Sequence, residues 1–212
     1  MKNFPFFTTE FGVAALTLQE IPYQGKAYIK LLDTQEPELL LKECVDFCRA
    51  VGAEEIFASG DPCLEAYPLH TALWRMRSDV LSVGNTDAAL WPVQSGTAVR
   101  FRDIYNEKAK KLPNSVWMDD TEEKAMLDEG DGYFVHRDGK LLGIGRVKGD
   151  EIRFIGSVRP GTGADVLRAL AHAITGETVI LEVASVNHKA IALYERLGFI
   201  KTTELSRWYK IK

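Results

Sequence analysis

The chain has 212 residues, of which 46% are hydrophobic and 26% are charged, and this composition predicts a soluble globular protein with a sizeable core. The formal net charge of -4 argues against a partner with a phosphate backbone or an anionic membrane surface, since such partners select basic faces. No stretch approaches the roughly 18 apolar residues that a membrane-spanning helix needs, and residues 1–12 lack the apolar centre of a signal peptide. We therefore expect a cytoplasmic protein that binds neither nucleic acid nor membrane.

The first half of the chain alternates strand-like and helix-like segments. Two apolar runs that flank a glycine-containing turn predict a hairpin over residues 12–33. Apolar residues then recur at spacings of three and four, which predicts a helix over residues 37–52. We expect Asp33 or Thr34 to cap the start of this helix and Gly52 to end it.

Two further segments complete this half. EEIFASG predicts a short buried strand, and residues 64–77 predict a helix that the chain enters near Pro68, since proline is tolerated in a first turn. The cysteines have no companions at the spacings of zinc ligands, which favours reduced thiols in the core. They are Cys44, Cys48 and Cys63.

A turn-rich, weakly charged segment then predicts a seam between two domains, which we place at residues 1–84 and 85–212. The second domain is expected to begin with a short strand, ALWPV, and a helix that Pro113 stops. Residues 116–129 are ambiguous. An antiparallel meander of three strands with two tight turns follows, and the chain ends with a helix, a strand, a helix and an extended segment: residues 132–158, 164–176, 178–184, 187–198 and 199–211.

Both halves contain a helix, a glycine, an acidic residue and an apolar strand in that order. This match indicates either an internal repeat or the coincidence of two alternating α/β patterns. The segments before the two helices differ, because the first half has DTQEPE and the second has VRPGTGAD.

VRPGTGAD connects a strand that ends at Val158 to a helix. Gly161, Thr162, Gly163 and Ala164 offer backbone N–H groups at the start of that helix, where the helix dipole favours a phosphate or pyrophosphate. The alternative is a plain strand-to-helix turn whose glycines serve the backbone conformation alone. A second glycine-rich stretch, GIGRVKG, lies between hairpin strands and opens no helix, so it does not predict a dinucleotide site.

The stretch NHKAIALYERLGF predicts a short amphipathic helix near the C-terminus. Asn187 is a suitable N-cap and Gly198 a suitable stop, and Ala190, Tyr194 and Leu197 share one face by their spacing. A phenol at the mouth of a sheet can donate a proton to a leaving group. The other interpretation is a tyrosine packed in the core.

Together the two motifs resemble those of the GNAT superfamily of N-acetyltransferases, in which a loop for the acetyl-CoA pyrophosphate precedes an N-x-x-A-x-x-x-Y-x-x-x-G-F helix. The resemblance covers residues 88–212. The loop departs from the family's Q/R-x-x-G-x-G/A, because Thr162 stands three residues after Arg159. The second motif matches at every position: Asn187, Ala190, Tyr194, Gly198 and Phe199.

The resemblance implies an α/β (α+β) fold, with a mixed, mostly antiparallel twisted sheet, flanking helices and a smaller, truncated GNAT-like half domain in front. It also implies an acetyl-CoA-dependent N-acetyltransferase in which a primary amine of a small molecule or protein attacks the thioester directly. The strands over residues 151–158 and 178–184 should splay to admit the pantetheine arm. Tyr194 is then the general acid, and the residues implied in cofactor binding are Ser157, Val158, Arg159, Gly161, Thr162, Gly163, Ala164, Asn187 and Tyr194.

The base is open. Glu151 and Glu182 lie on the two strands that should splay, although each also fits a solvated strand carboxylate. The first half lacks both the glycine loop and the Tyr-x-x-x-Gly-Phe ending, so we expect it to bind no CoA and to complete a substrate cleft or a packing face. This hypothesis implies one active site per chain. The chain is expected to be a monomer or a homodimer, and the sequence does not distinguish the two.

Two alternatives remain. A catalytically silent GNAT-fold protein could bind an acyl-CoA or a protein partner as a sensor or scaffold, and an α/β module could bind another phosphorylated ligand. The four histidines are scattered without metal-ligand spacing, so no metal is expected. The four tryptophans are expected in the core or at an interface: Trp74, Trp91, Trp117 and Trp208.

Overall fold

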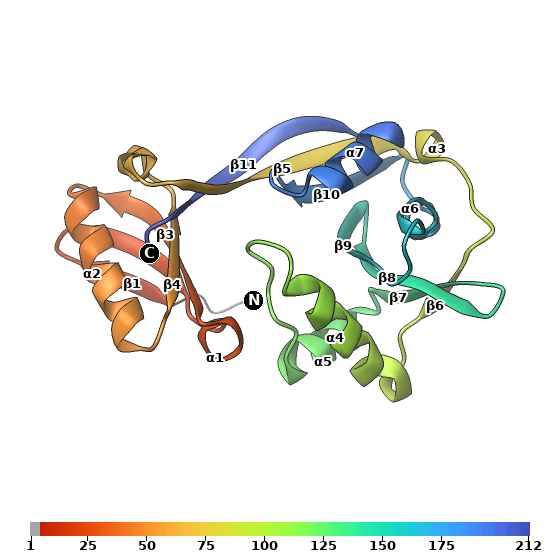
Figure 1. Cartoon of the computed structure of the whole chain (residues 1–212), viewed down its shortest axis with the longest axis horizontal. Helices are drawn as coiled ribbons and strands as arrows, with labels where there is room; N and C mark the ends of the chain where they lie inside the picture. The colour runs from red at the N-terminus through yellow and green to blue at the C-terminus, as the bar shows by residue number, and fades with distance from the viewer. Residues whose placement is uncertain (1–4) are drawn as a thin grey trace. The chain divides into compact units, whose positions relative to one another are not determined.

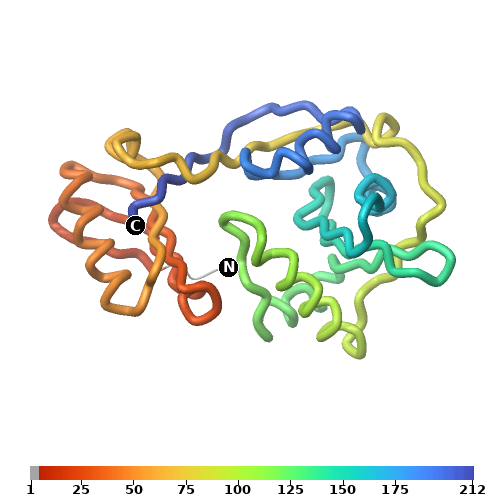
Figure 2. The backbone as a smooth tube through the Cα atoms, in the orientation of Figure 1, coloured from red at the N-terminus to blue at the C-terminus, as the bar shows by residue number. Residues whose placement is uncertain are grey.

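The computed structural model describes residues 5–212, which form two compact units. The smaller unit comprises the described residues up to Leu73 together with Glu204–Lys212, and the larger unit is Trp74–Thr203. The two predicted domains divide the chain differently, because two eleven-residue strands, β5 (Leu69–Asp79) and β11 (Ile200–Lys210), each contribute residues to both units. Figures 1 and 2 show these strands as the two passages of the chain from one unit to the other.

The smaller unit is a sheet with one long helix. Its strands follow the order β1-β2-β3-β4, with the C-terminal part of β11 beside β4. β3 and β4 are parallel, and the other pairs are antiparallel. The elements are β1 (Phe6–Thr9), β2 (Gly12–Thr17), α1 (Ile21–Gln24), β3 (Lys26–Thr34), α2 (Pro37–Ala50), β4 (Glu55–Ser59) and η1 (Pro62–Ala66).

α2 covers one face of this sheet with the apolar stripe that the sequence predicts. Leu40, Cys44 and Cys48 are fully buried against the inward-facing side chains of β3 and β4. The two cysteines are free, and burial raises the pKa of the Cys44 thiol to about 12 and that of Cys48 to about 11, so both are inert core residues. Cys63 is free but only partly buried, outside the predicted core position.

The larger unit is a mixed sheet with helices on both faces, in the strand order β11-β5-β10-β9-β8-β7-β6. β9 and β10 are parallel, and β6 to β9 form the predicted antiparallel meander. Besides β5 and β11 the elements are α3 (Val80–Val83), β6 (Ala89–Pro92), α4 (Ser95–Ala109), α5 (Asp120–Glu129), β7 (Gly132–Arg137), β8 (Lys140–Lys148), β9 (Glu151–Ser157), α6 (Gly163–Ala171), β10 (Thr178–Ala184) and α7 (His188–Arg196).

Two cores lie on the two faces of this sheet. α6 and α7 pack on one face, around Leu167, Leu170 and Tyr194, and α4 and α5 pack on the other, around Phe101 and Met126. The glycines of GIGRVKG serve this packing, since a Cβ on β8 at position 145 would lie 2.3 Å from Leu170 Cδ1. The mixed, mostly antiparallel sheet with flanking helices is the predicted fold class.

One predicted helix is wrong. The segment over residues 64–77 forms the short turn η1 and then β5, in which Ala72 and Met76 are buried while Arg75 and Arg77 are exposed. A spacing of four fits one helical turn and also two periods of a strand, so these buried positions do not distinguish the two structures. The predicted cap of α2 by Asp33 or Thr34 is also wrong, because the N-cap is Glu36 and its side chain makes no capping bond.

In the described part of the chain no helix is long and apolar enough to cross a bilayer. Within residues 5–212, His, Cys, Asp and Glu side chains form no group of three or more that could hold a metal ion.

Candidate active site

β9 and β10 separate soon after they meet. They pair only through two residues of each strand, which on β9 are Glu151 and Ile152. The register of β9 against β8 then shifts, so that Arg153 is an extra residue with no partner on β8. A bulge of this kind bends a strand and ends its regular pairing. The predicted splaying of these two strands is therefore confirmed, and the bulge at Arg153 explains it.

The turn after β9 is fixed against the start of β8. The Val158 N–H donates to the Leu142 carbonyl oxygen at 2.8 Å. The Thr162 hydroxyl lies 2.8 Å from the Arg159 carbonyl oxygen and 3.2 Å from that of Leu142. Val158 and the Thr162 hydroxyl, both predicted at the cofactor site, thus hold the turn in place.

The backbone of this turn leaves several donors open. Among the residues that the structure describes, no group accepts from the N–H of Gly161, Gly163 or Ala164, and the Thr162 N–H reaches only the Arg159 carbonyl oxygen at 3.4 Å. The first turn of α6 carries no side-chain cap. Unpaired N–H groups at a helix N-terminus, backed by the helix dipole, form a favourable site for a phosphate or diphosphate.

Two of the glycines have separate structural reasons. Gly161 has a φ of +83°, in the left-handed region that glycine adopts without strain, and a Cβ there would meet open space. A Cβ at Gly163 would lie 3.0 Å from Leu193 Cδ2 of α7. Glycine at position 163 therefore lets the start of α6 approach the tyrosine-bearing helix closely.

The charges beside the open donors are arranged in pairs. Asp165 lies in the first turn of α6, and Arg137 bridges its carboxylate to that of Asp87, with a distance of 3.2 Å to each. The two carboxylates raise the pKa of the Arg137 guanidinium, with Asp87 the larger contributor. Arg159 Nε donates to the Leu141 carbonyl oxygen at 3.1 Å. The negative charge nearest the donors is thus compensated.

The helix α7 forms as the sequence predicts. Asn187 is its N-cap and accepts from the Ala190 N–H at 3.3 Å, which leaves the Asn187 Nδ2 group as a donor. The helix ends before Gly198, whose φ is +87°. Tyr194 and Leu197 are buried on the predicted face, and the Tyr194 ring lies 5.9 Å from that of Phe199.

Tyr194 combines a buried ring with a free hydroxyl. The residue is 8% exposed, and its hydroxyl has no hydrogen-bond partner within residues 5–212. The Tyr194 oxygen is not fully buried, so it keeps some access to solvent. Burial raises the pKa of Tyr194 to about 12. The phenol is therefore protonated at neutral pH and can act as a donor.

The two candidate bases are both ion-paired. Glu182 lies on β10 one residue beyond the paired segment, and Arg75 of β5 contacts it at 3.0 Å. Glu151 lies 3.5 Å from Arg153 Nε. Sequence reasoning missed Arg75 because it placed that residue on a helix, and it missed Arg137 because an arginine before a tight turn carries no functional signal.

The FR47-like protein family model matches residues 157–209, from the end of β9 through most of β11. A protein of unknown function from Staphylococcus epidermidis superposes with a TM-score of 0.64 at 13% identity, over 98% of this chain and 93% of its own. A GCN5-related N-acetyltransferase from Sphaerobacter thermophilus gives a TM-score of 0.59 at 12% identity, over 94% of this chain and 76% of its own. The protein has the GNAT fold.

A further GNAT-fold structure is similar in extent. A tandem GNAT protein from the clavulanic acid biosynthesis pathway superposes with a TM-score of 0.56 at 16% identity, over 94% of this chain and 78% of its own. A comparison with curated protein sequences finds no match. The resemblance of the chain to the GNAT superfamily is confirmed at the level of the fold, whereas the truncated GNAT-like copy in the first half stays a prediction.

Proposed function

We propose that the protein is an acetyl-CoA-dependent N-acetyltransferase that acetylates a primary amine of a small molecule or of a protein. The observation that supports this most is the arrangement on one GNAT-type sheet of three open N–H groups at the start of α6 and the unpartnered hydroxyl of Tyr194 on α7. Both lie beyond the point where β9 and β10 separate. No element of this arrangement requires a metal.

The open N–H groups of Gly161, Gly163 and Ala164 would bind the diphosphate of coenzyme A. Arg159 adds a positive charge at the same turn, and Ser157 and Val158 line the strand end along which the pantetheine arm would lie. The Asn187 Nδ2 group is the remaining donor toward that arm. Acetyl-CoA supplies an activated acetyl thioester, which the acceptor amine attacks directly.

Tyr194 is the proposed general acid. Its Oη keeps its proton at neutral pH because burial raises the pKa to about 12, so the proton is available to a leaving thiolate. An acceptor amine with a pKa of roughly 10.4 arrives mostly as the ammonium form and must lose a proton to a base or to water before it attacks. We propose that this reaction takes place in the cytoplasm, in agreement with the ordinary soluble composition of the chain.

Thermal-shift measurements with acetyl-CoA, followed by a thiol-release assay over a panel of primary amines, test the proposal. At a ligand concentration of about 100 Kd we expect stabilisation of about 2.7 kcal/mol. Thiol release that depends on an amine supports the transferase. A shift without turnover on any amine would favour the silent acyl-CoA sensor, and a shift with nucleotides but not with acetyl-CoA would contradict both.

A further inference from the structure

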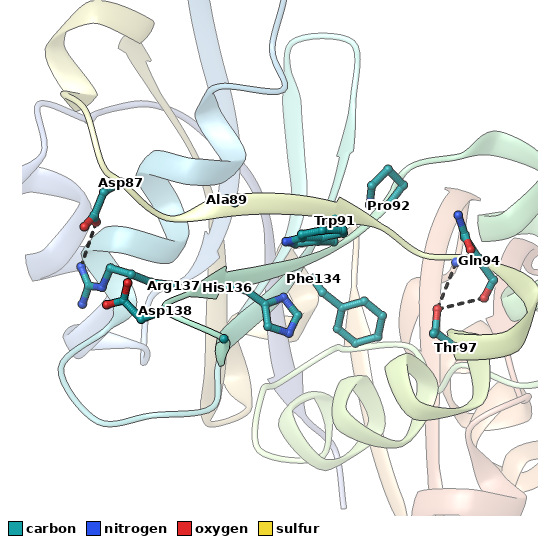
Figure 3. Close-up of a pocket in the computed structure, with 11 residues that line it drawn as sticks. Asp87, Ala89, Trp91, Pro92, Gln94, Thr97, Phe134, His136, Arg137 and Asp138 are labelled. Atoms are coloured by element: carbon teal, nitrogen blue, oxygen red, sulfur yellow. Dashed lines mark hydrogen bonds and ion pairs between the residues drawn. The ribbon is translucent and has the colours of Figure 1, made fainter.

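A cavity of about 700 Å³ lies at the outer edge of the larger unit's sheet, apart from the splayed strands. Its walls come from β6, β7, the first turn of α4 and the turn between β7 and β8 (Figure 3). β6 is the last strand of the sheet and lies three strand spacings from β9, a distance of about 14 Å. The aromatic part of the cavity is therefore distinct from the opening between β9 and β10, whereas its other end includes Arg137, which pairs with Asp165 at the start of α6.

Aromatic side chains form much of its wall. Trp91 is opposite Phe134 in the strand register, and Ala89 is opposite His136. Trp91 is 60% exposed, which excludes the core and leaves the interface position of the two that the sequence suggested, while Phe134 is buried and held edge-on by Phe101 at 5.7 Å. Because Ala89 is small, a recess remains between the Trp91 ring and the His136 ring (Figure 3). A recess between flat rings suits a planar aromatic group.

His136 supplies an unsatisfied polar atom in this wall. Its Nδ1 is buried and has no hydrogen-bond partner within the described residues. Desolvation, with a smaller effect from Arg100 on α4, lowers the pKa of His136, so the imidazole is neutral at pH 7. A buried nitrogen without a partner carries a free-energy cost that a ligand donor or acceptor, or an ordered water, would remove.

The charged side chains of the lining leave one charge uncompensated. They are Asp87, Arg137 and Asp138. Arg137 is already shared between Asp87 and Asp165, at 3.2 Å from each. Within residues 5–212 no cation pairs with the exposed Asp138 at the rim. This end of the cavity therefore favours a positively charged group.

We propose that the cavity binds an aromatic ammonium compound, with its ring in the recess between Trp91 and His136 and its charged nitrogen toward Asp138. The ring gains aromatic and apolar contact with Trp91, and the ammonium gains the carboxylate that has no partner. This binding site goes beyond the proposed function and does not depend on it. It assigns a second, non-catalytic ligand site to the same sheet.

Benzylamine is a suitable probe, followed by an NMR titration of the ¹⁵N-labelled protein at the Trp91 indole N–H. We expect saturable binding with a Kd on the order of 1 mM, as a ligand of eight heavy atoms allows. Benzyl alcohol keeps the ring without the charge, and cyclohexylmethylamine keeps the charge without the flat ring. Each should bind at least about threefold more weakly than benzylamine, since each lacks one of the two interactions.

Three variants locate the binding. Trp91→Ala should raise the benzylamine Kd about tenfold, and Asp138→Asn, which tolerates the left-handed backbone of that position, should raise it about threefold. Ala89→Leu fills the recess and should abolish binding, which keeps the test decisive if Trp91→Ala fails to fold. Leu81→Ala, at a 94% exposed position on α3, is the control and should leave the Kd unchanged.

Some results would overturn the proposal. They are no saturation by about 10 mM benzylamine, equal binding of benzyl alcohol, or a Kd that Ala89→Leu leaves unchanged. Saturating coenzyme A should not displace benzylamine, because the recess beside Trp91 lies three strand spacings from β9, and we expect at most about a threefold change in the benzylamine Kd through the charge of Arg137. Direct competition between the two ligands would assign benzylamine to the acyl-transfer site and would contradict the second site, while the proposed transferase would stand.

Discussion

Each of the two units contains a strand, a crossover helix and a second strand parallel to the first, but the two units differ in the turn between the first strand and the helix. These elements are β3, α2 and β4 in the smaller unit and β9, α6 and β10 in the larger unit. β3 and β4 pair through five residues of each strand, whereas β9 and β10 pair through two. The shared topology therefore does not by itself produce an opening between the strands.

The helix starts differ in electrostatics. α2 begins at Pro37, which has no N–H, and Glu36 and Glu38 place two carboxylates at that end. α6 begins at Gly163 with open N–H groups and with its only first-turn acid, Asp165, paired to Arg137. An anion is disfavoured at the first helix and favoured at the second, so a handful of residues between strand and helix decides which segment can bind a phosphate.

In the smaller unit, the parallel strands β3 and β4 also stay in contact beyond their paired segment. Gly60 follows β4, and a Cβ at this position would lie 2.2 Å from the Leu31 carbonyl oxygen of β3. The two backbones therefore touch just beyond the paired segment. In the larger unit the bulge at Arg153 directs β9 away from β10 at the corresponding step.

The sharpest test of this contrast is Tyr194→Phe. In the larger unit β10 is followed by the helix α7, which carries Tyr194, whereas in the smaller unit β4 is followed by the short turn η1 and Tyr67. We expect turnover to fall by about 100-fold to 1,000-fold, the usual value of a general acid, while the Kd of coenzyme A changes less than about twofold. Steady-state kinetics and calorimetric titration measure the two quantities.

Tyr67→Phe is the matched control and should leave both quantities unchanged. Since the pKa of Tyr194 is raised to about 12, ionisation of this phenol should cause no loss of rate between pH 7 and about pH 10. Equal turnover in Tyr194→Phe and the unmodified protein would remove the phenol from the mechanism.

Most elements of the larger unit follow from the sequence because each has a local signal. Asn187 caps α7 and Gly198 ends it as predicted, and the turn at Asp138 and Gly139 has the positive φ values of 51° and 70° that its residues favour. β5 does not follow, because the four-residue spacing of Ala72 and Met76 fits two structures.

The site itself could be predicted only in part. The glycines and Tyr194 form a recognisable pattern, but the bulge at Arg153 depends on the register between two strands, for which a single sequence has no local signal. The pairing of Arg137 with Asp165 joins residues 28 positions apart, and the recess beside Trp91 exists only because β6 lies next to β7. These features arise from long-range contacts.

Gly60→Ala tests how much the close contact between β3 and the residue after β4 stabilises the smaller unit. The substitution combines a φ of +111° with a contact of 2.2 Å to the Leu31 carbonyl oxygen, so we expect the free energy of unfolding to fall by about 2 to 4 kcal/mol. Denaturant unfolding measures the change. Gly52→Ala is the matched control, with a φ of +97° but a nearest neighbour at 3.8 Å, and should cost only about 1 kcal/mol. Equal losses in the two variants would show that backbone strain alone, without the close contact, sets the stability.

The assignment of one anion site per chain can be tested with Gly163→Val. A side chain here pushes against Leu193 and separates the donor turn from α7, so we expect the coenzyme A Kd to rise about tenfold. Calorimetric titration should give a stoichiometry of one for the unmodified chain. Gly176→Ala, at a position with no atom within 4 Å, should match the unmodified chain. A second binding event that survives Gly163→Val would place a coenzyme A site elsewhere and contradict the contrast between the two helix starts.

The smallest expected effect concerns the difference in charge between the N-termini of α2 and α6. Arg137→Gln leaves Asp165 uncompensated beside the open donors, so the coenzyme A Kd should rise about threefold at low salt, and the difference should shrink as salt is added. Arg49→Gln removes a comparable exposed pair with Asp46 on α2 and should change nothing. If Asp165→Asn in the Arg137→Gln background restores the original Kd, the pair acts through the carboxylate charge. If the Kd stays high, Arg137 contacts the ligand itself, and the compensation argument fails.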